Sequence, residues 1–232
     1  ARAARVPLRN HAASGCSFRW AIHILAPLKL SWCLTLSWSE PMAPIHDAAF
    51  NGDFETLRRL LAEGVSPDAT DGSARTPLHN LCLRDNHDTG GDDRPACLKL
   101  LRDAGANLDA TSGSAMTALH YRALSGDATM VSLLVEAGVN VNAADSEGYT
   151  ALHFAPSTRA LACVEVLLAA GASVNARSNS GRTPFDMALI TNHRRRWPLF
   201  LRAGAEIPTD NTHPYIVRVR NAGGFQRYAQ AH

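Results

Sequence analysis

The sequence predicts an all-α fold, a solenoid of about five stacked helical repeats followed by a C-terminal helical cap. Three observations predict it. A motif of the type Thr-Pro-Leu-His returns at steps of 33, 41, 33 and 33 residues, a glycine follows each copy, and a polar stretch leads to the next copy. The motifs begin at Ala43, Thr76, Thr117, Thr150 and Thr183, and the glycines are Gly64, Gly105, Gly138, Gly171 and Gly204. A fixed period near 33 residues is typical of an array in which each unit packs on its neighbours.

Each repeat is predicted to hold two helices and a projecting finger. The first helix opens on a capping threonine and a proline, as at Thr76-Pro77, where the missing N–H of proline costs nothing. The second helix carries the apolar run and ends at the glycine, which can adopt a left-handed conformation. The 12 residues from each of the first four glycines to the next motif are polar and rich in turn formers, which predicts a finger.

The motif, a following Gly-Asp, a Leu-Leu pair and an Ala-Gly-Ala-x-Val-Asn-Ala segment together resemble the ankyrin repeat. The resemblance covers roughly residues 42–208, and five copies agree in phase. It implies L-shaped units of two antiparallel helices and a β-hairpin-like finger, with a concave face that in this family usually binds another protein. The predicted repeats are 42–74, 75–115, 116–148, 149–181 and 182–208.

Three departures from the pattern are expected to change local structure. The second repeat has eight extra residues between its helices, within 84–95, which we interpret as an acidic loop because their spacing does not match an EF-hand. Pro156 is expected to shorten or kink the first helix of the fourth repeat. Pro198 is expected in the first turn of the last helix, where proline is tolerated. The fifth repeat has Asp186 where the others have histidine.

The recurring motif histidines suggest bracing rather than metal binding. Neighbouring helices pack about 8–10 Å apart, whereas zinc–nitrogen bonds are about 2 Å long, so histidines of adjacent repeats lie too far apart to share an ion. We expect these side chains to bind backbone groups and hold the fingers. The residues are His46, His79, His120 and His153. The sequence contains no phosphate-binding glycine loop, Gly-x-Ser-x-Gly or His-Glu-x-x-His motif, so we expect no enzyme activity, cofactor or metal.

Charge and cysteine content bear on partners and location. The net charge is +4 over residues 1–41, −7 over 42–192 and +5 over 193–232, and an acidic repeat body argues against nucleic acid as a partner. The apolar stretch 20–38 is interrupted by lysine, histidine and proline, so no membrane span is expected. Five cysteines without a Cys-x-x-Cys motif indicate a reduced, intracellular chain. We expect a cytoplasmic monomer, with the nucleus as an alternative, or an organelle if residues 1–41 are a transit peptide.

Both ends fall outside the regular repeats. Residues 1–41 lack the pattern and are interpreted as an organelle-targeting peptide, a secretory signal or anchor, or a mis-assigned start upstream of Met42, and they are expected to add nothing to the fold. Residues 209–232 are in phase with a degenerate sixth repeat and are predicted to form a cap. The amphipathic pattern still runs at His232, which leaves open a longer native chain.

The predicted function is protein–protein recognition, as an adaptor, scaffold or regulatory subunit. The alternative is the substrate-docking region of a longer enzyme such as a kinase or ubiquitin ligase. By resemblance, the binding positions precede each motif on the fingers or lie late in the first helices. They are Arg75, Met116, Tyr149 and Arg182 on the fingers, Glu147 and Asn179 nearer the tips, and Phe50, Asn51, Arg84, Ser157 and Thr158 on the helices. Tyr149 with Arg75 and Arg182 is expected to anchor a segment that carries an acidic group.

Overall fold

The computed structural model describes residues 43–83, 93–157, 161–191 and 196–207. The described residues all belong to one unit, Pro41–His232. The predicted N-terminal extension (1–41) and C-terminal cap (209–232) lie outside the described residues.

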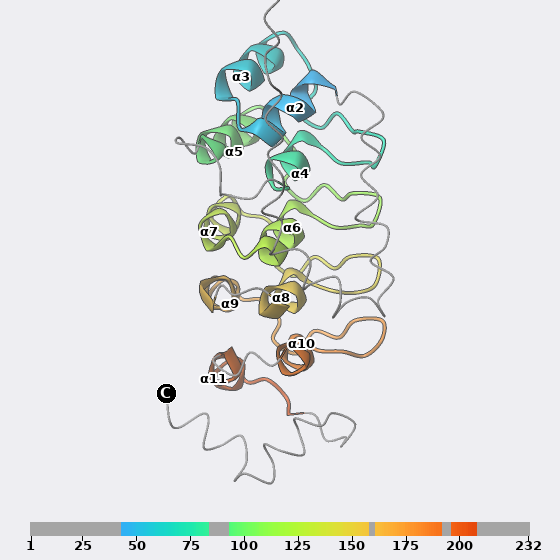
Figure 1. Ribbon diagram of the computed structural model, residues 1–232, viewed down its shortest axis with the longest axis vertical. Helices are drawn as coiled ribbons and strands as arrows, with labels where there is room; N and C mark the ends of the chain where they lie inside the picture. Colours follow the sequence, from blue (N-terminus) through green and yellow to red (C-terminus); the bar gives the residue numbers. More distant parts are fainter. Residues whose placement is uncertain (1–42, 84–92, 158–160, 192–195, 208–232) are drawn as a thin grey trace, which may run out of the picture. The chain divides into compact units, whose positions relative to one another are not determined.

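Five helix pairs stack in the described part of the chain, which confirms the predicted repeat solenoid (Figure 1). The inner helices, which lie between the fingers and the outer helices, are α2 (Pro44–Asn51), α4 (Pro77–Leu81), α6 (Ala118–Ser125), α8 (Ala151–Phe154) and α10 (Pro184–Ile190). The outer helices are α3 (Phe54–Ala62), α5 (Arg94–Asp103), α7 (Ala128–Glu136), α9 (Leu161–Ala169) and α11 (Trp197–Arg202).

The inner helices begin as the motif predicts. Thr76, Thr117, Thr150 and Thr183 are the N-cap residues of α4, α6, α8 and α10, and each forms a capping box with the residue three positions on. The first inner helix differs, because its N-cap is Ala43, whose side chain makes no capping hydrogen bond.

Aspartate side chains cap the N-terminal ends of two outer helices, α3 and α7. The Asp127 side chain accepts a hydrogen bond from the Met130 amide at 3.1 Å and caps α7, and Asp53 caps α3 through the Thr56 amide at 3.0 Å. The C-terminal end of α7 reverses at Gly138, whose φ of +92° is left-handed and therefore suited to glycine.

The apolar core lies between the inner and outer rows. Inner-helix side chains such as Leu119 and Phe185 and outer-helix side chains such as Leu134 and Phe200 are at most 1% exposed. Each repeat also packs on the next, since α2 contacts α4, α6 contacts α8, and α7 contacts α9. The hydrophobic burial is therefore distributed along the array rather than gathered in one centre.

The structure confirms both predictions about proline. The helix α8 stops after four residues and continues as a short 3-10 helix, η3 (Ala155–Ser157), which contains Pro156. Pro198 is the second residue of α11 and lies in its first turn. The inner helix α4 is also short, with five residues, and the insertion follows it; its residues 84–92 lie outside the described part.

Candidate functional site

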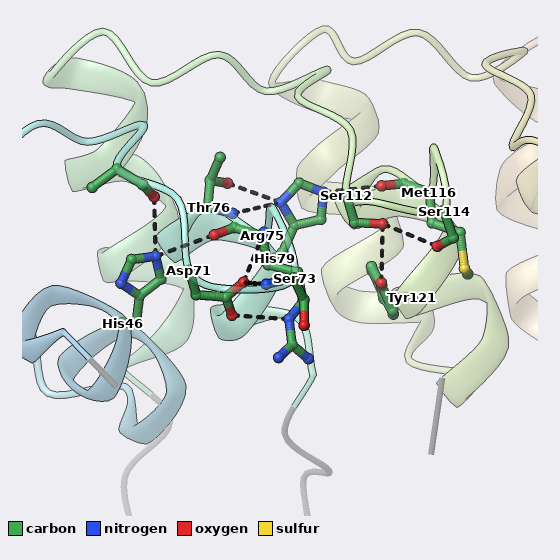
Figure 2. A network of polar contacts seen from close by, with 11 residues as sticks. His46, Asp71, Ser73, Arg75, Thr76, His79, Ser112, Ser114, Met116 and Tyr121 are labelled. Carbon is green, nitrogen blue, oxygen red and sulfur yellow. Dashed lines mark hydrogen bonds and ion pairs between the residues drawn. The ribbon is translucent and has the colours of Figure 1, made fainter. Parts of the chain in front are cut away.

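In the first and third fingers, an aspartate at the first corner accepts hydrogen bonds from backbone amides of the same finger. Asp71 Oδ1 accepts hydrogen bonds from the amides of Ser73 at 2.8 Å and Arg75 at 3.0 Å, and its Oδ2 pairs with Arg75 Nε at 3.0 Å (Figure 2). Asp145 accepts the amides of Glu147 at 2.9 Å and Tyr149 at 2.8 Å in the third finger. These contacts fix the conformation of each finger up to the residue that precedes the motif.

The two corner carboxyls titrate differently because their neighbours differ. Burial raises the pKa of Asp71, but the amides of Arg75 and Ser73 and the Arg75 guanidinium outweigh it, so the pKa lies below its ordinary value. Burial also raises the pKa of Asp145, and there the amides of Tyr149, Glu147 and Gly148 do not outweigh it. Its finger offers no cation like Arg75.

The finger tips are joined by a ladder of backbone hydrogen bonds. The Gly113 amide donates to the Ser73 carbonyl at 3.0 Å, and the corresponding distances in the next two steps are 3.2 Å and 2.8 Å. Those steps run from Ser146 to Ser114 and from Asn179 to Glu147. Because every step uses a tip amide, the fingers form a connected surface rather than independent loops.

A second ladder runs along the loops that lead to the fingers. In each repeat an Asp or Asn side chain accepts the backbone amide of the next repeat, at 2.7–2.9 Å. The acceptors are Asp68, Asp109, Asn142 and Asn175, and the donors are Asn107, Asn140, Ser173 and Glu206. This ladder was not predicted from the sequence, although its acceptors recur at the repeat period.

The motif histidines brace the fingers, as predicted. His79 Nδ1 accepts the Thr76 amide at 3.1 Å, while its Nε2 lies 3.0 Å from the Met116 carbonyl of the next finger (Figure 2). His120 and His153 repeat this arrangement, with the Tyr149 and Arg182 carbonyls as the cross-repeat acceptors. Because Nδ1 accepts an N–H, the ring proton resides on Nε2, and the neutral histidine donates it to the carbonyl.

Burial favours the neutral form of these rings. It lowers the pKa of His79 and His153 below the ordinary value, and that of His120 to about 4. In the fifth repeat Asp186 replaces the histidine in capping its own helix, since its Oδ2 accepts the Thr183 amide at 2.8 Å.

Most of the predicted partner-binding residues that the structure describes reach the surface. Arg75 and Arg182 are half-buried on their fingers, and Glu147 and Asn179 are exposed near the tips. On the first inner helix, Phe50 is half-buried and Asn51 is exposed. Ser157 ends η3, and Arg84 and Thr158 lie outside the described residues.

Two predicted contact residues are buried instead. Met116 is 2% exposed and Tyr149 is 4% exposed. The Tyr149 ring packs edge-on against His153, with centroids 5.3 Å apart, and lies 5.9 Å from Phe154. Its hydroxyl lies 3.5 Å from Ser180 Oγ on the next finger. The structure thus gives Tyr149 a role in joining neighbouring repeats, and it corrects the expectation that this ring is open to a partner.

Phe50, which was predicted from the sequence, belongs to a longer row of apolar side chains on the inner helices whose other members were not predicted. They stand seven residues after the first residue of each motif, at the register of Phe50 and Ser157, and they are half-buried. We define the inner-helix row as Phe50, Leu83, Leu124 and Ile190. Counting seven residues from every motif would have found all four.

The inner-helix row lies on the side of the helices that faces the fingers. Tyr121, one turn before Leu124, donates its hydroxyl hydrogen to Ser112 Oγ on the finger at 3.3 Å (Figure 2). Residues three apart in a helix share a face. Leu124 of the third repeat therefore lies on the side of its helix that faces the finger of the second repeat.

The helix pairs, the fingers and the ladders define a class of protein, a stacked helical-repeat array with a finger surface. Comparison with family models identifies the family. Residues 45–89 match a model described as ankyrin repeats (many copies), and residues 89–178 match one described as ankyrin repeats (3 copies). These matches cover more than half of the chain, which belongs to the ankyrin-repeat family. A comparison with curated proteins gave no match. The fifth repeat lies beyond the matched residues and is defined by α10 and α11.

Two further findings concern the described residues alone. None of their helices combines the length and the apolar character that a bilayer crossing requires. Their His, Cys, Asp and Glu side chains do not gather in groups of three or more that could hold a metal ion.

Proposed function

We propose that this chain is a protein-recognition module that binds its partner along the inner-helix row and the adjoining fingers. Ankyrin repeats are generally protein–protein interaction modules. The observation that carries the proposal is the recurrence of half-buried apolar side chains at one register, beside fingers that carry Arg75 and Arg182. Such partly exposed apolar side chains with arginine nearby are typical of interface centres.

The fingers limit how a partner can bind. Their tip amides donate to the preceding finger in the three steps described, so a partner strand cannot pair with those groups. The partner is therefore recognised through side chains: it makes apolar contacts with the inner-helix row and places an acidic group opposite Arg182. The module would act as an adaptor, a scaffold or a regulatory subunit.

The proposed compartment is the cytoplasm or the nucleus. Cys82, Cys97 and Cys163 are buried, and burial raises the pKa of Cys163 to about 12. Buried thiols with a high pKa are inert structural residues, which agrees with a reducing environment.

The test uses the full chain as bait for quantitative partner capture, with two leucines of the third repeat changed in turn. Leu124→Lys alters the inner-helix row, whereas Leu133→Lys alters the outer helix α7, and both leucines are half-buried. We expect Leu124→Lys to weaken capture of the partner at least about tenfold, as a lost interface anchor does, and Leu133→Lys to leave it unchanged.

Arg182→Ala tests the acidic group separately and is expected to weaken capture less than Leu124→Lys. Equal losses for the two lysine variants would indicate a stability effect, and unchanged capture for Leu124→Lys and Arg182→Ala would place the partner elsewhere on the chain. Thermal melting of each variant separates these outcomes.

A further inference from the structure

A fully buried arginine stands where three of the other repeats place alanine and the second repeat places Leu81. Arg122 lies five residues after the first residue of its motif and is 0% exposed. The same register holds Ala48, Ala155 and Ala188 in the first, fourth and fifth repeats. A buried guanidinium is costly unless charge and hydrogen-bonding partners compensate for the lost water. Its presence at an alanine position therefore requires a structural reason.

The short inner helix of the second repeat supplies that reason. The helix α4 ends at Leu81, whereas α6 continues to Ser125, so α4 lacks about one turn relative to its neighbour. Carbonyl groups in the last turn of a helix have no partner within the helix. Arg122 Nη2 donates to the Leu81 carbonyl at 3.0 Å and occupies the position beyond the end of α4.

The other arm of the guanidinium reaches the second helix of its own repeat. Arg122 Nη1 lies 3.3 Å from Asp127 Oδ2, and the two side chains are 0% and 6% exposed. Asp127 Oδ1 meanwhile caps α7 through the Met130 amide. One side chain therefore links the C-terminal end of α4, the middle of α6 and the N-terminal end of α7.

The other short inner helix, α8, is also followed by a carbonyl group that a buried arginine binds. In η3, which continues α8, the Pro156 carbonyl accepts a hydrogen bond from Arg196 Nη1 at 3.1 Å and one from Thr191 Oγ1 at 3.2 Å. Arg196 belongs to the following repeat and is 3% exposed. Both shortened inner helices thus end on a buried arginine that the next repeat contributes.

We infer that the Arg122 bridge, formed by Arg122 with Asp127 and the Leu81 carbonyl, couples the first two repeats to the rest of the array. Helix packing across this interface is sparse: α3 packs on α5 and α7 on α9, but α5 and α7 make few contacts. In a linear array, a weak interface between neighbours is where the chain separates into independent folding units. The bridge compensates for the surface that the short α4 does not provide.

Hydrogen–deuterium exchange of the full chain tests this inference, because it reads each repeat separately. In Arg122→Met the side chain keeps its length and loses its donors. We expect amide exchange in α4 and α5 to accelerate at least about tenfold, with exchange in α8 to α10 nearly unchanged. Arg58→Met is the control, since that arginine forms an exposed ion pair with Glu55 and should change neither group.

Two further variants decide the case if Arg122→Met does not fold. Arg122→Lys keeps the charge with a different geometry, and Asp127→Asn keeps the capping oxygen of α7 and removes the counter-charge. Each should accelerate exchange in α4 and α5 more than in α8 to α10. Equal acceleration in all repeats, no acceleration, or slower exchange in Arg122→Met would each overturn the inference.

Discussion

At the scale of single residues, the motif histidine both caps its own helix and bonds to the next finger, whereas the fifth repeat keeps only the cap. His120 Nδ1 accepts the Thr117 amide within its own repeat, and Nε2 donates to the Tyr149 carbonyl of the next finger. Asp186 retains the first function, because its carboxylate accepts the Thr183 amide. A short side chain can cap its own helix, whereas the cross-repeat bond needs the reach of the imidazole.

This separation predicts the effect of His120→Asn. The asparagine oxygen can replace Nδ1 as the acceptor of the Thr117 amide, but no atom replaces Nε2. We expect the free energy of unfolding to fall by about 1–3 kcal/mol, as a buried carbonyl loses its donor. Urea denaturation measures the change. Asp186→Asn, which removes no cross-repeat bond, should cost less, and an equal cost would contradict the assignment.

The first repeat offers a stabilising change. His46 is fully buried and its Nδ1 has no hydrogen-bond partner, and the N-cap residue of its helix is Ala43 rather than threonine. In three other repeats the threonine hydroxyl lies 2.9–3.0 Å from this nitrogen. We expect Ala43→Thr to stabilise the chain by about 0.5–2 kcal/mol.

Ala43→Val is the control for this prediction, since valine has the shape of threonine without its hydroxyl. Calorimetry or urea denaturation of both variants measures the difference. A gain of the same size for valine would show that packing, and not the hydrogen bond to His46, is responsible.

At the scale of elements, the fingers show where a glycine is required by a neighbour. Ala74, Ala115, Gly148 and Gly181 occupy one finger position, and all four have positive φ, from 56° to 79°. Alanine is therefore accepted in this conformation twice. Gly148 differs because a Cβ there would lie 2.8 Å from the Asn179 amide nitrogen, which takes part in the tip ladder.

We accordingly expect Gly148→Ala to destabilise the chain by about 2–4 kcal/mol, from backbone strain and the displaced ladder bond. Gly181→Ala is the control: a Cβ there meets nothing within 4 Å, so only the strain of about 1–2 kcal/mol applies. Thermal melting compares the two, and equal losses would show that the contact with Asn179 can relax freely.

The elements themselves were largely predictable from the sequence, and their side-chain environments were not. The motif and the glycine mark helix ends through local chemistry, so the helices and the effects of Pro156 and Pro198 followed from the chain alone. The burial of Tyr149 involves its near neighbours His153 and Phe154, but also Ser180 on the next finger, 31 residues further along the chain. Local pattern does not contain that information.

The same limit explains the inner-helix row and Arg122. The positions of Leu83 and Leu124 can be counted from the motifs, but only the structure shows that these two leucines are half-buried rather than fully buried. The sequence shows an arginine among alanines at one register, but its role depends on α4 ending early. Long-range features of this kind require the three-dimensional arrangement.

At the scale of the whole described array, stability should depend on pH through the motif histidines. Burial holds the pKa of His120 near 4, below the ordinary 6.5, and lowers those of His79 and His153. Between these values the unfolded chain binds protons that the folded chain does not. Stability is therefore fully present above pH 6.5 and declines as the pH falls towards the folded pKa.

For His120 alone, lowering the pH from 7.5 to 5 should cost about 2 kcal/mol. Urea denaturation across this range measures the total. The His120→Asn variant should show a shallower pH dependence than the unaltered chain, by about that amount. Identical slopes would mean that the His120 ring titrates normally in the folded protein.

The fixed tautomer of these rings also has a spectroscopic consequence. Each Nε2 proton is held inside the array, on a carbonyl that belongs to the following finger. Such protons exchange slowly with water, so His79, His120 and His153 should give separate imidazole N–H resonances in an NMR spectrum. The signal of each ring would then report on one junction, and a mutation, denaturant or bound partner could be located along the chain by which resonance it shifts or removes.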